Sequence, residues 1–569
     1  MTDQTSEAPA ETITAESQPA QAQPAPEVRG LRVEKIAEGA TEVFAPMRDR
    51  MKLAGNLYLP DGEGPFPCIV TRTPYGKDTM ELFSDPRAAR KYTRAGYAYL
   101  VQDTRGKGRS EGHYGGFTDD RNDGYDTIEW MARQSWSNGR IGVTGASAMG
   151  ITTNMAAIAN PPHLVCAFVI VAGNDTAFVG GAFKQRDMGD WNRGQGVAEE
   201  RIRSSAASYV ATALSVTGDV LHNARFIHIP IYNYGGWYDL FSVGNVRNFQ
   251  QLQNHGSRGA RGNQKLEMGP FGHGDMAGDL AYPNGSELLK GATDEIRWFD
   301  YWLKGVDNGI MDEPPVRVYM MASARKGALS PKNRWVRFAN WPPAPQIVDY
   351  FLHDDGSLSR KAPTEAPASR AYDFDPANPV PTHGGSNLTF EKGPMDQRPI
   401  GERQDYLRFQ TAVLDRDVAI AGPVSLELWA STDGPDTDFM VKLVDVYPDG
   451  YEAIVLDSAL RTRYRHGRGR DDITMMTPGA PEKLTLDLWD TAITFEKGHR
   501  IAVHVTSSNA PRFDINPNTG ELPGRDVVTR VARNAIYLDA AHPSAMRLPV
   551  IYLEDEAWAA PAGLGAELS

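Results

Sequence analysis

The stretch Ile141-Gly142-Val143-Thr144-Gly145-Ala146-Ser147-Ala148-Met149-Gly150 decides the fold. An apolar run ends there in a turn of small residues, and a segment that can form a helix follows at 151–159. A strand, a sharp turn and a helix, with a serine at the apex, is the layout of a nucleophile elbow. The turn forces the serine into an unfavourable backbone conformation, so its neighbours must be small, and Gly145 and Gly150 supply that room. Ser147 is therefore a candidate nucleophile.

The match to the common G-x-S-x-G pattern is incomplete, because Met149 occupies the second glycine position. Turns rich in glycine and serine are frequent in proteins of every class, so this stretch alone indicates a catalytic site only weakly. A serine becomes a nucleophile when a base accepts its proton and an acid orients that base. The rest of the chain must supply these partners.

Composition and charge exclude several classes of function. The chain has 569 residues, too many for one hydrophobic core, and its length predicts about three domains. A net charge of −13 without a lysine or arginine cluster argues against a nucleic-acid partner. No apolar run reaches the roughly 18 residues that a membrane helix needs. Only two cysteines are present, Cys68 and Cys166, both in apolar runs, and two are too few for a disulfide scaffold or a cysteine-based zinc site. No cluster of histidine and glutamate has metal-ligand spacing, and we predict neither metal nor cofactor.

The chain divides by composition into four parts. Residues 1–28 are dominated by Ala, Pro, Glu, Gln, Thr and Ser and predict a disordered segment. Short apolar strands alternate with helical stretches over 29–173 and 226–312, which is typical of an α/β domain with a parallel sheet covered on both faces. Residues 174–225, with helical stretches near 197–205 and 208–221, predict a helical insertion above that sheet. Short alternating strands over 313–569 predict an all-β sandwich or jelly roll.

Two strand ends offer partners for Ser147. In a parallel-sheet hydrolase the acid and the base follow later strands, in the order Ser, Asp or Glu, His. Asp239 comes just past one strand, and His273 follows the next with a glycine on each side, which lets a loop carry the imidazole close to another backbone. Asp239 could instead cap a helix, and His273 could be a surface-loop histidine. Order and strand-end placement together favour a triad of Ser147, Asp239 and His273.

A serine hydrolase also needs at least two hydrogen-bond donors for the oxyanion. The amide of Ala148, directly after the nucleophile, is one of them. Tyr75 lies in a strand-end turn early in the sheet and is the candidate for the second, although it could simply be a tyrosine packed in a turn. We predict that the substrate pocket is lined by Met149, Trp237, Phe241 and Phe271.

The candidate triad and several other sequence motifs resemble those of the CocE/NonD hydrolases. This family includes cocaine esterases, α-amino acid ester hydrolases, glutaryl acylases and X-prolyl dipeptidyl aminopeptidases. The resemblance runs from about residue 35 to 555. It implies an α/β-hydrolase domain with an inserted helical cap, followed by a C-terminal jelly roll. It also implies Ser147 as nucleophile, Asp239 as acid, His273 as base, and the Tyr75 hydroxyl and Ala148 amide as oxyanion donors. The matching stretches are 72–75, 102–112, 123–130, 136–139, 236–239, 269–273, 436–439, 444–450, 508–514 and 516–520.

The chain departs from the family pattern beside the nucleophile and beside the acid. Ala148 stands where the family usually has a tyrosine, which keeps the amide donor but removes a bulky wall of the acyl site. Phe241 and Ser242 stand where amino-ester hydrolases place carboxylates for a substrate ammonium, which argues against recognition of an α-amino group. These changes and the short insertion predict a wide, apolar acyl pocket.

The sequence therefore predicts a serine hydrolase that cleaves a small-molecule ester or amide through an acyl-enzyme. Two alternatives stay open: an X-prolyl dipeptidyl aminopeptidase, and a non-catalytic protein whose jelly roll binds a glycan. We expect no membrane partner, and the oligomeric state stays open, a homo-oligomer included. Residues 1–28 lack the features of a secretory signal, so we expect a cytoplasmic protein, or a periplasmic or secreted one if a signal peptide has been removed.

Overall fold

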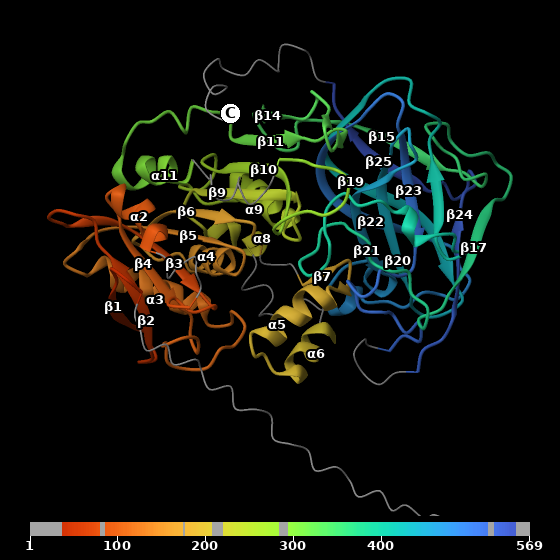
Figure 1. The fold of residues 1–569 in the computed structure, drawn as a ribbon. Coiled ribbons are helices and arrows are strands. Elements are labelled where there is room, and N and C mark those ends of the chain that lie inside the picture. Colours follow the sequence, from red (N-terminus) through yellow and green to blue (C-terminus); the bar gives the residue numbers. More distant parts are fainter. Residues whose placement is uncertain are drawn as a thin grey trace, which may run out of the picture.

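The computed structural model describes residues 37–79, 86–173, 177–207, 220–283, 294–521 and 528–552 (Figure 1). The predicted disordered segment 1–28 and nearly all of the predicted helix at 208–221 lie outside these residues. Among the helices that the structure describes, none is long and apolar enough to cross a membrane.

A ten-stranded sheet organises the first part of the chain, in the order β1-β2-β4-β3-β5-β6-β9-β10-β11-β14. The strands from β4 to β11 in this order pair in parallel, as the short apolar strands predicted. Antiparallel strands complete both edges. The bounds are β1 (Thr41–Pro46), β2 (Lys52–Tyr58), β3 (Phe66–Thr73), β4 (Ala98–Asp103), β5 (Ser137–Ala146), β6 (Leu164–Ile170), β9 (Ile231–Tyr238), β10 (Lys265–Gly272), β11 (Val316–Met320) and β14 (Arg334–Phe338).

Helices cover both faces of this sheet. Successive side chains of a strand point to opposite faces, and here apolar side chains lie on both. In β3, Cys68 and Val70 belong to the apolar cluster on one face and Ile69 to the cluster on the other. The first face is covered by α3 (Asp120–Ala132), α4 (Ala148–Ala159), α8 (Val220–Asn223) and α9 (Ser242–His255). The second is covered by α2 (Pro86–Arg94) and α11 (Asp294–Phe299).

An inserted segment, residues 177–226, leaves the sheet after β6 and returns to it at β9. It contains β7 (Phe178–Val179), β8 (Ala182–Phe183), a π-helical turn at Gln185–Gly189, α5 (Asp190–Gly194) and α6 (Glu199–Ala207), besides α8. Figure 1 shows α5 and α6 at the junction between the sheet and the C-terminal strands. The segment can therefore contact both parts of the protein.

The chain from residue 346 onward forms two further sheets. The larger has the order β16-β15-β25-β19-β24-β17 with β22 paired to β19, and the smaller has the order β18-β23-β20-β21. Their apolar core continues into the first sheet through Trp237, Leu266 and Val316. The bounds are β15 (Gln346–Leu352), β16 (Leu358–Ser359), β17 (Ser369–Phe374), β18 (Leu407–Gln410), β19 (Val418–Thr432), β20 (Asp438–Val446), β21 (Glu452–Arg461), β22 (Glu482–Phe495), β23 (Arg500–Thr506), β24 (Ala532–Tyr537) and β25 (Ala545–Val550).

The first sheet continues past the domain boundary predicted at residue 313. β11 pairs in parallel with β10, with Leu266 opposite Val316, and β14 pairs with β11. The predicted boundary thus does not coincide with the end of the sheet, which is reached at Phe338. The short alternating pattern of β11 fits a strand of either sheet, so periodicity alone could not assign it.

Candidate active site

Ser147 stands at a strained turn between β5 and α4. Its backbone has a φ of 56° and a ψ of −122°, a conformation that side-chain-bearing residues rarely adopt. A Cβ atom added to Gly145 would lie 2.5 Å from Met149, and one added to Gly150 would lie 2.4 Å from the Cβ of Ala172. The predicted need for small residues around the serine is confirmed at both glycines.

The three side chains predicted as a triad form one hydrogen-bonded chain. The Nε2 atom of His273 lies 2.9 Å from the Ser147 hydroxyl oxygen, and its Nδ1 atom lies 2.8 Å from Oδ2 of Asp239. Because an ionised carboxylate only accepts hydrogen bonds, Nδ1 carries the proton and Nε2 is free to accept the serine proton. The arrangement can therefore transfer a proton away from the serine oxygen.

The acid is fixed by its own turn. Asp239 is completely buried, and its second carboxylate oxygen accepts the amide of Phe241 at 2.7 Å. Phe241 in turn packs edge-on against the His273 ring, with the ring centres 5.5 Å apart. The carboxylate thus also organises the turn before α9 while it orients the imidazole, but the N-cap residue of α9 is Phe241 and not Asp239.

Sheet topology explains why these residues meet. Ser147, Asp239 and His273 follow the parallel strands β5, β9 and β10, whose carboxyl ends lie along the same edge of the sheet. Ligands and catalytic groups of open α/β sheets gather at this edge.

Both predicted oxyanion donors lie beside the serine. The amide of Ala148 is the first of α4, where a helix has no internal acceptor for its N–H groups. Burial raises the pKa of the Tyr75 phenol, and the interactions of its hydroxyl with the Trp191 and Ser147 side chains lower that pKa by less. Tyr75 therefore keeps its proton at neutral pH and can donate it in a hydrogen bond.

A buried arginine holds the strand end that carries Tyr75. Arg72 is 1% exposed, pairs with Asp120 at 2.8 Å and donates to the Gln102 side chain at 2.9 Å. Its carbonyl accepts the Thr152 hydroxyl of α4 at 2.9 Å. The turn after β3 is thereby linked to the helix that begins at the nucleophile.

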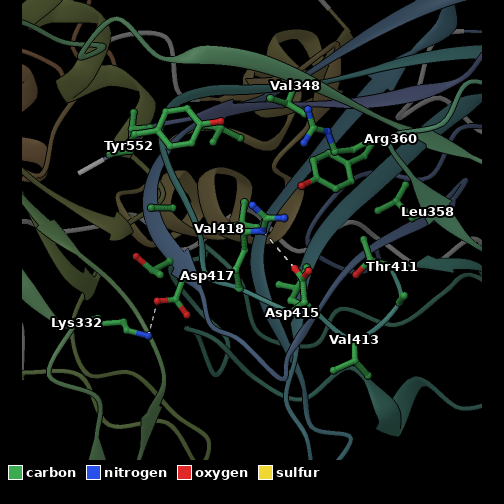
Figure 2. A pocket seen from close by; sticks show the side chains of 18 of the residues that line it. Lys332, Val348, Leu358, Arg360, Thr411, Val413, Asp415, Asp417, Val418 and Tyr552 are labelled. Atoms are coloured by element: carbon green, nitrogen blue, oxygen red, sulfur yellow. Dashed lines mark hydrogen bonds and ion pairs between the residues drawn. The ribbon is translucent and has the colours of Figure 1, made fainter. Parts of the chain in front are cut away.

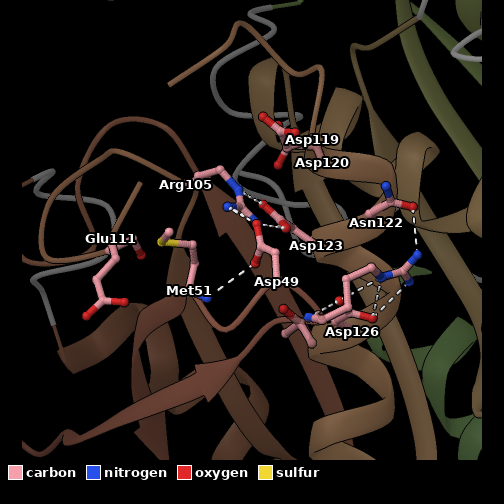
Figure 3. A network of polar contacts seen from close by, with 12 residues as sticks. Asp49, Met51, Arg105, Glu111, Asp119, Asp120, Asn122, Asp123 and Asp126 are labelled. Carbon is pink, nitrogen blue, oxygen red and sulfur yellow. Dashed lines mark hydrogen bonds and ion pairs between the residues drawn. The ribbon is translucent and has the colours of Figure 1, made fainter. Parts of the chain in front are cut away.

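Ion pairs and hydrogen bonds hold the glycine-rich loop after β4, residues 103–112, in place. Figure 3 shows Arg105 between Asp49 and Asp123, with guanidinium-to-carboxylate distances of 2.6 Å to each. Asp103 accepts the amides of Lys77 and Arg109. Arg109 of the same loop pairs with Glu42 at 2.9 Å. Because acidic groups already pair with both guanidinium groups, the loop is unsuitable as a phosphate site.

All four predicted pocket residues are buried in the apolar core. Trp237 is 1% exposed and donates its indole N–H to the Tyr319 carbonyl at 2.9 Å, and Phe271 is completely buried against Tyr234. Both belong to strands that are buried on both faces, so position near a strand end does not expose them. Met149 is 4% exposed and belongs to an apolar cluster of the core, and Phe241, also 4% exposed, packs its ring against the imidazole.

Sequence reasoning missed two residues of the inserted segment. Trp191 donates its indole N–H to the Tyr75 hydroxyl at 3.0 Å, and Lys184 donates to the carbonyl of Leu240 at 3.0 Å. An aromatic residue in a segment rich in Gly, Arg and Asp was the available signal for Trp191. No pattern pointed to Lys184.

A cavity of about 440 Å³ adjoins the site, lined among others by Tyr75, Lys107, Tyr114 and Gln195. Another, of about 960 Å³, lies among the C-terminal strands and includes none of the predicted site residues (Figure 2). Within the described ranges, no group of three His, Cys, Asp or Glu residues could hold a metal ion.

Comparison with known proteins shows which family the chain belongs to. Residues 49–216 match the family model of the X-Pro dipeptidyl-peptidase (S15 family), and residues 308–546 match that of the X-Pro dipeptidyl-peptidase C-terminal non-catalytic domain. Cocaine esterase from Rhodococcus sp. (strain MB1 Bresler) is 30% identical, over 90% of this chain and 98% of its own. The chain belongs to the CocE/NonD hydrolase family.

Solved structures of CocE/NonD relatives share the fold. An α-amino acid ester hydrolase superposes with a TM-score of 0.76 at 26% identity, covering 93% of this chain and 100% of that one. A CocE/NonD family hydrolase from Staphylococcus aureus gives a TM-score of 0.70 at 19% identity, over 90% and 93%, which shows the fold alone. This CocE/NonD chain is therefore a hydrolase, and the alternative of a non-catalytic glycan-binding protein is set aside.

Proposed function

We propose that this CocE/NonD hydrolase is a serine esterase that cleaves small carboxylic esters, and activated amides, through an acyl-enzyme. The observation that supports this most strongly is the chain of hydrogen bonds from Ser147 through His273 to the buried Asp239, at 2.9 and 2.8 Å. All three are carried by turns at one edge of the sheet.

The proposed reaction has two stages. His273 takes the proton of Ser147 while the serine oxygen attacks the ester carbonyl, and the resulting oxyanion receives hydrogen bonds from the Tyr75 hydroxyl and the Ala148 amide. The imidazolium then protonates the leaving alcohol as the C–O bond breaks, which leaves an acyl group on Ser147. Water repeats the sequence on the acyl-enzyme, releases the acid and restores the serine.

The side chains directly beside Ser147 and His273 favour an uncharged, apolar acyl group. Ala148 places only a methyl group beside the nucleophile, and Phe241 presents an aromatic edge to His273. Ser242 is 2% exposed, so neither it nor Phe241 supplies an accessible anion for a substrate ammonium. We infer that the inserted segment acts as a cap over this site and that the C-terminal sheets form a jelly roll.

An X-prolyl dipeptidyl aminopeptidase is the second candidate, because residues 49–216 match a model named for that activity. Such an enzyme must bind a free N-terminal ammonium, which the proline separates from the scissile bond. Phe241 and Ser242 supply no anion for an ammonium next to the attacked carbonyl, which argues only against recognition of an α-amino ester.

A parallel assay tests both candidates. Purified protein is given p-nitrophenyl esters of two- to eight-carbon acids and Gly-Pro-p-nitroanilide, and each rate is compared with that of Ser147→Ala. We expect ester turnover that disappears in the variant. Ester turnover retained by a folded Ser147→Ala protein would refute the proposed function, and cleavage of the anilide without ester cleavage would favour the peptidase.

A further inference from the structure

The indole of Trp191 contacts the proposed oxyanion donor from outside the sheet. Trp191 belongs to α5 of the inserted segment, and its Nε1 atom lies 3.0 Å from the hydroxyl oxygen of Tyr75. The two rings meet at 90° with their centres 6.5 Å apart. The contact joins residues 116 positions apart in the chain.

We propose that Trp191 is a positioning residue that directs the Tyr75 proton toward the oxyanion, an inference that rests on the proposed function. An indole N–H can only donate, so the Tyr75 oxygen must be the acceptor of this bond. The phenol then keeps its own proton for another partner, and the Ser147 side chain is the other polar side chain that interacts with this hydroxyl. A hydrogen bond accepted by a phenol also polarises its O–H and strengthens it as a donor.

Packing fixes the indole in this orientation. The Trp191 ring stacks on Phe117 with an interplanar angle of 4° and a centre-to-centre distance of 5.5 Å. The carbonyl of Trp191 accepts the amide of Gln195 at 2.9 Å. Lys107 donates to the Gln195 carbonyl at 2.7 Å and to its side-chain oxygen at 3.1 Å. Contacts of the Trp191 ring and of the residue that follows α5 therefore hold the donor next to Tyr75.

The geometry gives the inserted segment a part in the chemical step. A donor that acts on the Tyr75 oxygen strengthens an interaction made chiefly in the transition state, so it raises kcat and leaves KM nearly unchanged. If Trp191 only lined the substrate pocket, its substitution would weaken substrate binding equally in the presence and in the absence of the Tyr75 hydroxyl.

A double-mutant cycle separates these roles. Trp191→Phe removes the N–H and retains an aromatic ring, and Tyr75→Phe removes the phenol oxygen that it serves. We expect Tyr75→Phe to lower kcat by about 10²- to 10³-fold. We expect Trp191→Phe to lower kcat by about 5- to 10-fold in the wild-type background and by less than about 2-fold in the Tyr75→Phe background. Equal losses in the two backgrounds would overturn the proposal.

An arylboronic acid supplies a second measurement if turnover of the Tyr75→Phe background is too slow to compare. The Ser147 oxygen adds to boron and His273 takes the serine proton, which places a boronate oxygen at the oxyanion position. Trp191→Phe should weaken boronate inhibition by the same factor as kcat and leave inhibition by the product carboxylate unchanged. Unchanged boronate inhibition would overturn the proposal.

Matched controls keep the two proposals separate. Trp130→Phe, in a tryptophan that packs on Trp136, should leave kcat unchanged. Ester turnover that persists in Ser147→Ala refutes the proposed function itself. An inactive Ser147→Ala combined with equal Trp191→Phe losses in both backgrounds refutes only the role of Trp191.

Discussion

The Nζ atom of Lys184 lies 3.0 Å from the carbonyl oxygen of Leu240, the residue directly after the proposed catalytic Asp239. Lys184 is completely buried and its ammonium lies 5.1 Å from the centre of the Trp489 ring. One side chain of the inserted segment thus contacts the acid turn of the first sheet and a strand of the C-terminal part.

Replacing Lys184 should destabilise the protein and lower the kcat of ester cleavage. Lys184→Met leaves the Leu240 carbonyl buried without its donor, and we expect the free energy of unfolding to fall by about 1–3 kcal/mol. Because that carbonyl belongs to the turn that holds Asp239, kcat should fall as well. Urea unfolding and ester kinetics measure both. Lys483→Met, at a side chain that is 46% exposed, is the control and should change neither.

The stability difference between wild type and Lys184→Met should depend on pH. Burial lowers the pKa of Lys184 to about 8, below its ordinary value of 10.5. Between these values the unfolded chain holds a proton that the folded chain has released, so the free energy of unfolding rises with pH. Wild type should therefore gain stability relative to Lys184→Met as pH rises through 8, by up to about 1.4 kcal/mol per pH unit. A difference that stays constant from about pH 7 to 9.5 would contradict this assignment.

The steric requirement at the elbow predicts an effect of a single methyl group. A Cβ at Gly150 would lie 2.4 Å from that of Ala172, so Gly150→Ala should cost about 1–3 kcal/mol of stability through overpacking. Gly194 in α5 has nothing within 4 Å of the same position, and Gly194→Ala should be neutral or slightly stabilising. Thermal unfolding distinguishes the two, and equal midpoints would show that the backbone relaxes freely around Gly150.

A buried ion cluster of the C-terminal part should support the inserted segment. Arg461 is 1% exposed and binds Asp438 at 2.9 Å and Asp514 at 3.0 Å, and Asp514 also accepts the amide of Phe183. Arg461→Met leaves two buried carboxylates unpaired and should cost about 3–5 kcal/mol. It should also lower esterase activity, because Phe183 precedes Lys184.

The control for this cluster is an exposed ion pair. Arg533 and Asp373 are 58% and 60% exposed, so Arg533→Met should change the free energy of unfolding by at most about 1 kcal/mol. Similar unfolding midpoints for Arg461→Met and Arg533→Met would mean that the buried cluster does not stabilise the protein.

The chemistry at the strand ends could be predicted from the sequence because it depends on local rules. A serine between glycines at a strand-to-helix turn needs a strained backbone, and the structure has it at Ser147. Asp239 and His273 follow strands whose parallel pairing brings their ends to one edge. Chain order and strand position were therefore enough to select the three side chains that the structure joins by hydrogen bonds.

Contacts made between distant segments could not be predicted in this way. Trp237 and Phe271 lie near strand ends like the triad residues, but their strands are covered on both faces and bury them. Trp191 and Lys184 act through the path of the inserted segment, which no residue spacing encodes. The 436–439 and 508–514 motifs were recognisable as patterns, but their buried ion pairs became visible only in three dimensions.

The most direct test of the proposed mechanism is intact-protein mass spectrometry after reaction with a fluorophosphonate ester, followed by peptide mapping. The account predicts one phosphonyl group per chain, on the peptide that carries Ser147, together with loss of esterase activity and no labelling of a folded Ser147→Ala variant. A phosphonyl group on any other residue, or equal labelling of the variant, would contradict the account.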